Sequence, residues 1–211
     1  MSGEQKYKDG DGLKITFESS NARELLIFTD RYQLYKAKVS DFEDCKASTL
    51  GIYLPTRLQM DDGESIVTVI DPGDYRNHLL LAFENGKIAR VELSAYETKN
   101  NRKKLVGAYS DKSPLVSAFV LEGEKDIACM SDDDRTLVFN TSLIQPKTTR
   151  STQGVNVMTL KKKRVLVSAM PVENTRIENI SRYRVRSIPA AGAMLKAEDK
   201  EERQLSMDAE M

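Results

Sequence analysis

Residues 25–39, LLIFTDRYQLYKAKV, contain the pattern that decides the fold. The apolar run at residues 25–29 is followed by a short polar segment and then by the alternating segment 33–39. Apolar runs this short, bounded by polar turns, are typical of buried β-strands rather than helices. The stretch therefore predicts a β-hairpin.

Two later stretches repeat this pattern. Strands are predicted at residues 79–83 and 88–93, joined by Asn85-Gly86, and at residues 127–130 and 136–140, joined by three aspartates. Asn-Gly is a strong hairpin signal, because a tight hairpin turn needs positive φ at both central positions. Closing strands are predicted at residues 65–70, 115–121 and 165–170.

The three repeats span residues 24–70, 78–121 and 125–170 approximately. Within each repeat a glycine (Gly51, Gly107 or Gly154) follows a basic or hydroxylic stretch and precedes a further predicted strand. A period of roughly 50 residues with about four strands predicts propeller blades. We therefore expect an all-β, propeller-like array with a reduced number of blades.

The flanking segments differ from the repeats. Residues 1–11 are expected to be a flexible tail, and residues 13–17 to be the closing strand of a preceding blade. Residues 176–186 are expected to supply one or two more strands, so that the domain spans residues 12–186. The low apolar periodicity of residues 187–211 predicts a disordered tail or a frayed helix.

The charge of the chain is balanced but uneven. With 32 Lys+Arg and 32 Asp+Glu, the composition excludes a simple polybasic nucleic-acid binder. Residues 145–186, however, hold 10 basic and 2 acidic side chains, a net charge of +8. Residues 1–144 carry −5 and residues 187–211 carry −3. Such an uneven field can steer an anionic partner.

Catalytic and metal-binding patterns are not found in the sequence. His78 has no neighbouring Ser or Cys motif, and Cys45 and Cys129 lack metal-ligand spacing. The three aspartates at residues 132–134 fill a hairpin turn. No glycine-rich phosphate loop is present, and no segment approaches the roughly 20 apolar residues of a membrane helix. We therefore expect no catalytic residue, metal or cofactor.

Three segments carry a resemblance to a known family. LLIFTDRYQLYKAKVSDF, LLLAFENGKIARVEL and IACMSDDDRTLVFN resemble the blade signature in the C-terminal domains of the A subunits of DNA gyrase and topoisomerase IV. In that signature an apolar strand ending in Phe-Thr precedes a turn and a strand that runs into Lys-Val. Residues 151–160 are similar to the family's glycine-centred strand. The resemblance covers residues 12 to about 170.

This resemblance implies a β-pinwheel, a propeller-like array whose perimeter binds and bends duplex DNA. It also implies a non-catalytic accessory domain of an ATP-dependent type II topoisomerase, an isomerase of the bacterial cytoplasm and nucleoid. Its partners would be DNA, an ATPase partner subunit and the breakage-reunion core that belongs to the same polypeptide. The basic box of gyrase (QRRGGKG-like) is missing, which favours the topoisomerase IV type.

DNA binding of this kind needs Lys and Arg on exposed edges, where they contact phosphates. Candidates come from the second strands of the hairpins, the loops before the glycines and the last turn of the third repeat. They are Lys36, Lys38, Arg90, Lys46, Arg102, Lys103, Lys104, Arg150, Lys161, Lys162, Lys163 and Arg164. The strand cations could instead protect exposed edges against aggregation, and residues 161–164 could be an ordinary solvated turn.

A second interpretation is a propeller that binds another protein and not DNA. The net charge of zero and the acidic residues 1–144 favour it, whereas the cations before each glycine favour DNA. No group of residues supports an independent enzyme.

Overall fold

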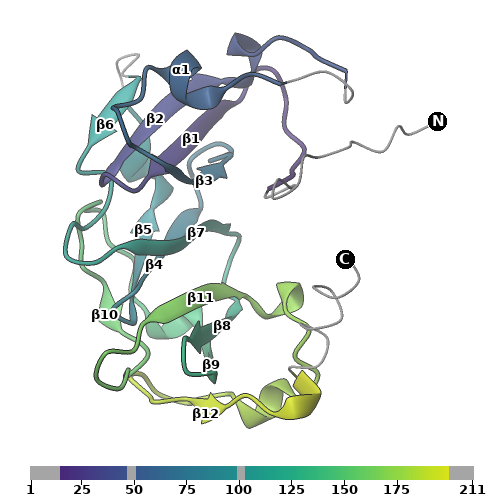
Figure 1. Ribbon diagram of the computed structural model, residues 1–211, viewed down its shortest axis with the longest axis vertical. Coiled ribbons are helices and arrows are strands. Elements are labelled where there is room, and N and C mark those ends of the chain that lie inside the picture. Colours follow the sequence, from purple (N-terminus) through teal and green to yellow (C-terminus); the bar gives the residue numbers. More distant parts are fainter. Residues whose placement is uncertain (1–14, 47–50, 99–102, 200–211) are drawn as a thin grey trace.

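The computed structural model describes residues 15–46, 51–98 and 103–199. They form three four-stranded antiparallel sheets that follow one another along the long axis of the molecule (Figure 1). Blade 1 has the strand order β3-β1-β2-β6, blade 2 has β10-β5-β4-β7 and blade 3 has β11-β8-β9-β12. The all-β, propeller-like fold predicted from the sequence is therefore confirmed.

The strands of the three hairpins and their closing strands lie at the predicted positions, with bounds that differ by one residue at most. Their bounds are β1 (Glu24–Thr29), β2 (Gln33–Lys38), β3 (Ile66–Ile70), β4 (His78–Phe83), β5 (Lys87–Glu92), β7 (Leu115–Leu121), β8 (Asp126–Ser131), β9 (Arg135–Asn140) and β11 (Leu166–Pro171). The remaining strands are short: β6 (Lys104–Val106), β10 (Val155–Asn156) and β12 (Ala193–Met194).

The hairpin turns differ from the predicted type. Positive φ occurs at the last turn residue alone, in Tyr32, Gly86 and Asp134, and Asn85 has negative φ. Gly86 N–H donates to the carbonyl of Phe83, at 3.0 Å. The last residue of each turn therefore has the left-handed backbone conformation. Gly adopts this conformation most easily, but Tyr32 and Asp134 adopt it here as well.

The blades exchange strands, which the sequence did not indicate. β6 follows β4 and β5 in the chain, yet it pairs with β2 of blade 1. In the same way β10 follows β8 and β9 but pairs with β5 of blade 2. The prediction that each blade is built from one continuous repeat is therefore wrong, because the later repeat supplies the outermost strand of the earlier blade.

The exchange buries apolar side chains between neighbouring blades. Tyr109, directly beyond β6, is 2% exposed and lies 6.3 Å from the rings of both Phe28 in blade 1 and Phe83 in blade 2. Between blades 2 and 3, Val157 and Met158 beyond β10 pack in the same way and are almost completely buried. Each interface between neighbouring blades thus has its own apolar cluster.

A short helix covers the free face of blade 1. The segment after Gly51 was expected to be a strand, but it forms helix α1 (Leu54–Leu58), with Pro55 in its first turn. Pro is favoured there because it has no N–H to leave unpaired. Leu58 packs against Ile27 and Tyr35 of blade 1, and α1 lies over this blade at the top of Figure 1.

The opposite end of the array is closed by residues 172–199. Residues 176–186 do not form the expected strands; they form the 3₁₀ turn η5 (Ile180–Arg182) and a bridge between Arg184 and Val138. Residue 187 is too early for the start of a tail, because Ala193 of β12 pairs with Thr136 and Leu195 is 7% exposed. Residues 15–17 are not a strand either.

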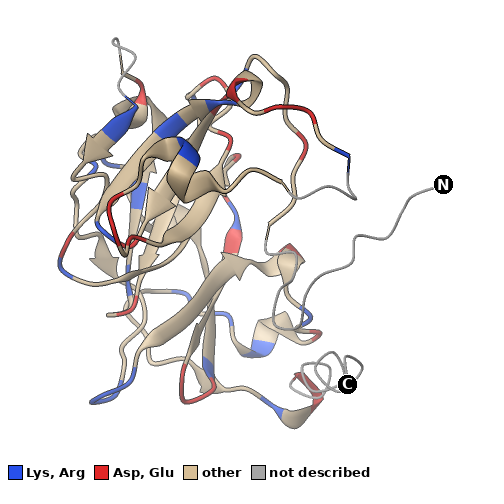
Figure 2. Ribbon diagram, turned by 45° about the horizontal axis from the view of Figure 1, so that its top comes forward, with Lys and Arg blue, Asp and Glu red and all other residues tan. Residues whose placement is uncertain are grey.

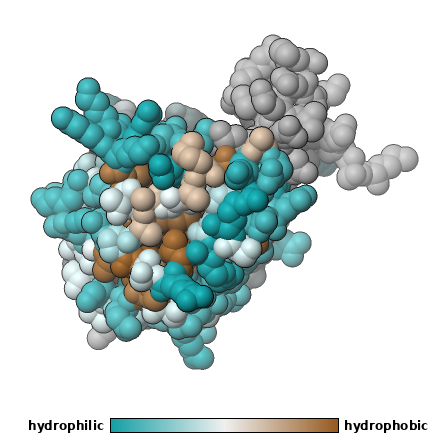
Figure 3. Space-filling view, turned by 90° about the horizontal axis from the view of Figure 1, so that it is seen from below, coloured by the Kyte–Doolittle hydropathy of each residue, from teal (hydrophilic) through white to brown (hydrophobic). Residues whose placement is uncertain are grey.

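The apolar cluster under this end segment contains Ile177, Tyr183 and Leu195. Seen from below in Figure 3, apolar atoms show at the centre of the end face, within a rim of hydrophilic side chains. In the part of the chain that the structure describes, no helix is long and apolar enough to cross a membrane.

Candidate nucleic-acid interface

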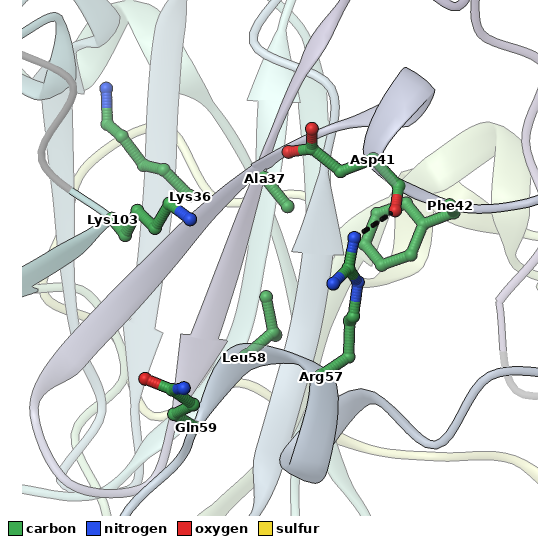
Figure 4. Close-up of a pocket in the computed structure, with 8 residues that line it drawn as sticks. All are labelled: Lys36, Ala37, Asp41, Phe42, Arg57, Leu58, Gln59 and Lys103. Atoms are coloured by element: carbon green, nitrogen blue, oxygen red, sulfur yellow. Dashed lines mark hydrogen bonds between the residues drawn. The ribbon is translucent and has the colours of Figure 1, made fainter.

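A pocket lies at the outer edge of blade 1 (Figure 4). It is bounded by the 3₁₀ turn η1 (Val39–Asp41), by α1 and by Lys103, which immediately precedes β6. Its lining residues are Lys36, Ala37, Asp41, Phe42, Arg57, Leu58, Gln59 and Lys103. Arg57 Nη2 donates to the main-chain carbonyl of Asp41, at 2.7 Å.

Four charged side chains line this pocket: Lys36, Asp41, Arg57 and Lys103. Arg57 and Lys103 are exposed cations, whereas Lys36 is buried and pairs with Glu24. Asp41 adds a carboxylate, which accepts a hydrogen bond from the N–H of Lys38, at 2.9 Å. The pocket is therefore positive, but its charge is partly compensated.

A second pocket occupies the corresponding place in blade 2. It is lined by Ala95, Gly107, Thr148, Thr149, Arg150 and Ser151. Arg150 Nη1 donates to the main-chain carbonyl of Ala95, at 3.2 Å. This pocket has one cation, three hydroxyl side chains and no acidic lining residue.

The two pockets are equivalent by topology. The turns η1 and η2 (Leu93–Tyr96) both directly follow the second strand of a hairpin, and Asp41 and Ala95 are their third residues. In each case an arginine donates to the carbonyl of that residue, Arg57 in blade 1 and Arg150 in blade 2. We call these pockets the blade 1 notch and the blade 2 notch.

The basic turn of residues 161–164 lies beside acidic side chains. Lys163 has φ +65, and all four side chains are exposed. Arg164 pairs with Asp132 at 3.5 Å, and Lys161 pairs with Asp133 at 3.6 Å. The continuous blue turn at the lower left of Figure 2 is therefore partly neutralised by the acidic hairpin turn of blade 3.

Two predicted contact residues are buried instead of exposed. The Lys36 side chain is 4% exposed, and its Nζ lies 2.9 Å from the carboxylate of Glu24. Arg90 is 9% exposed and donates to the carbonyl of Thr141, at 3.3 Å. The prediction that Lys36 and Arg90 form exposed strand edges is wrong, because both point into the packing around neighbouring strands.

The other predicted residues lie in separate places. Lys38 and Lys46 are exposed, and Arg102 lies outside the described residues. Lys104 Nζ lies 2.7 Å from a carboxylate oxygen of Asp61. This contact lowers the pKa of Asp61 and raises the pKa of Lys104.

The glycines do not occupy equivalent positions in the second and third repeats. Val106 pairs with the first residue of β2, and Asn156 pairs with the first residue of β5, so these two residues correspond. Gly154 therefore precedes its strand, whereas Gly107 follows β6. The expected alignment of cations before each glycine is wrong for the second repeat.

The site also contains residues that the sequence did not single out. Arg57 reaches the blade 1 notch because α1 folds over that blade, and no sequence motif marks it. The hydroxyls of Thr148, Thr149 and Ser151, by contrast, belong to the hydroxylic stretch before Gly154 that the sequence did indicate.

Residues with reactive side chains elsewhere are isolated. His78 Nδ1 lies 3.4 Å from Arg90 Nη2, and burial together with that cation lowers the pKa of His78. Burial raises the pKa of the Cys129 thiol far above its usual value. Among residues 15–46, 51–98 and 103–199, no cluster of His, Cys, Asp and Glu side chains is suited to hold a metal ion.

The stacked, strand-exchanged sheets form a propeller-like β-pinwheel. A family model described as "DNA gyrase C-terminal domain, beta-propeller" matches residues 125–173. The chain is similar to the A subunits of DNA gyrase and topoisomerase IV, which confirms the resemblance predicted from the sequence.

Individual relatives include both gyrase and topoisomerase IV. The chain is 26% identical over 167 residues to the A subunit of DNA gyrase from Borreliella burgdorferi, covering 78% of this chain and 20% of the relative. It is 26% identical over 172 residues to the A subunit of DNA topoisomerase 4 from Staphylococcus epidermidis, covering 80% of this chain and 21% of the relative. The chain thus spans about a fifth of the length of these curated relatives.

Solved structures share the fold. The C-terminal domain of DNA topoisomerase IV superposes with a TM-score of 0.69 at 23% identity, over 80% of this chain and 53% of that one. The C-terminal domain of E. coli ParC superposes with a TM-score of 0.67 at 14% identity, over 92% of this chain and 85% of that one.

Proposed function

We propose that this chain is the DNA-binding and DNA-bending part of the A subunit of a type II topoisomerase. It would present a duplex segment to the breakage-reunion core of the same polypeptide, which works with an ATPase partner subunit in the bacterial cytoplasm. The observation that supports this function best is the pair of equivalent notches on the outer edges of blades 1 and 2, each with exposed or half-exposed cations.

The electrostatics favour weak, localised binding. The chain has no net charge, and part of its basic surface is neutralised by neighbouring carboxylates. Phosphate contacts supply affinity through release of counterions, and a few such contacts are sufficient for non-specific binding. Bending a short duplex costs on the order of 1–6 kcal/mol, so contacts on successive blades must share that cost.

The test is a titration of a fluorescent duplex of about 30 base pairs with the full chain, repeated at several salt concentrations. Three phosphate contacts predict a slope of about −3 in a plot of log affinity against log salt, and therefore a loss of roughly 50-fold between 50 and 200 mM salt. A chain that does not bind the duplex at about 50 mM salt would contradict the proposal.

A second candidate function, binding of another protein, is favoured by the net charge of zero and by the acidic residues 1–144. The duplex titration distinguishes the two functions, since a protein-binding module shows no salt-dependent DNA affinity.

A further inference from the structure

The blade 2 notch combines the groups that bind a phosphate. A guanidinium offers several N–H donors in a fixed plane that matches phosphate oxygens. Here Arg150 is accompanied by the hydroxyls of Thr148, Thr149 and Ser151, which are all exposed. Because no carboxylate lines this notch, the positive charge of Arg150 is not compensated by its lining residues.

Arg150 is also held in place before any ligand arrives. Its Nη1 donates to the carbonyl of Ala95, and a guanidinium has further N–H donors that can bind an anion. A guanidinium that is already oriented loses less conformational entropy when it binds than a free surface lysine does.

Gly107 is one of the lining residues of the notch. It has φ +64, and a Cβ atom added to it would meet no heavy atom within 4 Å. The glycine follows β6, whereas Thr148–Ser151 come from the third repeat, so strand exchange brings the two sides of the notch together.

Two other basic places on the described surface are less suited to a phosphate. The blade 1 notch contains the carboxylate of Asp41. The turn of residues 161–164 faces Asp132 and Asp133. An anion at either place would lie near a carboxylate and lose part of the attraction of the cations.

We propose that the blade 2 notch is a seat for one phosphodiester group of duplex DNA, bound by the Arg150 guanidinium and the hydroxyls of Thr148, Thr149 and Ser151. The proposal rests on the proposed function and assigns the main phosphate contact to this notch. If the main contact is in this notch, the basic turn of residues 161–164 is not required for DNA binding.

The test compares Gly107→Asp with Gly107→Asn. Both residues tolerate positive φ, and they have nearly the same size. Only Asp places a negative charge in the seat. We expect Gly107→Asp to bind a 30-base-pair duplex about tenfold more weakly than Gly107→Asn at about 50 mM salt, with a smaller salt slope.

Two further variants separate the notch from the basic turn. The double variant Lys162→Gln/Lys163→Asn should bind within about twofold of the unchanged chain. Arg150→Gln should lower the affinity by about tenfold. Because Arg150→Gln also removes the bond to Ala95, its fold is checked by thermal unfolding, and the Gly107 pair tests the seat independently.

The outcomes distinguish the two proposals. An unchanged chain that does not bind DNA contradicts the proposed function itself. An unchanged chain that binds, with Gly107→Asp and Gly107→Asn indistinguishable, overturns the phosphate seat and leaves DNA binding intact. If only the Lys162/Lys163 variant loses affinity, the main phosphate contact lies on blade 3, and the proposed site in the blade 2 notch is wrong.

An NMR measurement tests the ligand. If the Arg150 Nε–H resonance shifts with inorganic phosphate but not with duplex DNA, the assignment of the site to DNA is wrong.

Discussion

At the scale of single residues, the buried carboxylate of Glu64 accepts hydrogen bonds from several parts of blade 1. It is 7% exposed, and it accepts hydrogen bonds from Thr29 Oγ1, from Gln33 Nε2 at 2.7 Å and from the Tyr35 hydroxyl at 2.7 Å. The N–H of Asp61 donates to it as well, at 3.0 Å. Burial would raise the pKa of Glu64, but these hydrogen bonds outweigh burial and lower it. The carboxylate therefore ties the turn before β3 to both strands of the hairpin.

Replacing this carboxylate should destabilise the domain. Glu64→Gln leaves an amide facing several donors, so we expect the free energy of unfolding to fall by about 2–3 kcal/mol in urea denaturation. Because the pKa is lowered in the folded state, the stabilising effect is present above the ordinary value of 4.5 and is lost as the pH falls through the folded pKa. The difference between Glu64→Gln and the unchanged chain should therefore shrink in acid. Glu43→Gln, at an exposed position, serves as the control and should change stability by less than about 0.5 kcal/mol.

At the scale of elements, the hairpin and closing strands could be predicted from the sequence, because short apolar runs and polar turns are local signals. Pairing between repeats could not be predicted. Val155–Asn156 has no feature that distinguishes a strand added to its own blade from one added to the preceding blade. The chemistry of the rim was predicted in part: Arg150 and Lys103 do line the notches. Arg57 was missed because its position depends on how α1 packs.

The donated strand of blade 2 depends on a close approach at Gly154. A Cβ atom there would lie 2.3 Å from the carbonyl oxygen of Ile88, whereas at Gly107 it would meet nothing within 4 Å. Both glycines have positive φ. In thermal or urea unfolding, Gly107→Ala should cost about 1–2 kcal/mol from backbone conformation alone. Gly154→Ala should cost about 1–3 kcal/mol more, because β10 must move away from β5. Equal losses for the two variants would show that the close approach is not a constraint.

At the scale of the whole molecule, the array has two different ends. Blade 1 is covered by α1 from its own repeat, and blade 3 receives β12 from the segment that follows its closing strand. β12 takes the place of the outer strand that blades 1 and 2 obtain from the following repeat, whereas α1 covers the face of blade 1 that has no neighbouring blade. Neither was visible in the repeat pattern, since an end cap does not share the sequence of the unit it replaces.

The end segment should therefore be required for blade 3. A chain ending at Ser187 lacks β12 and the buried Leu195, and we expect the free energy of unfolding to fall by at least about 2 kcal/mol. Amide exchange should accelerate most in β9 and least in β2. A chain ending at Asp199 retains β12 and the contact between Asp199 and Tyr183, so it should unfold like the full chain. Uniformly faster exchange across all three blades would contradict a local role for this segment.

Strand exchange also sets the order in which the chain can fold as it leaves the ribosome. Blade 1 has three strands once residue 70 has emerged, but it has to wait for β6 at residues 104–106 before its outer edge is closed. Blade 2 waits for β10 in the same way. Each of blades 1 and 2 is therefore completed only after the hairpin of the next blade has been synthesised. The strand that completes it comes from a repeat whose own blade still lacks its outer strand. Because each of blades 1 and 2 contains a strand from the following repeat, two neighbouring blades can separate only if that strand leaves the sheet of the earlier blade.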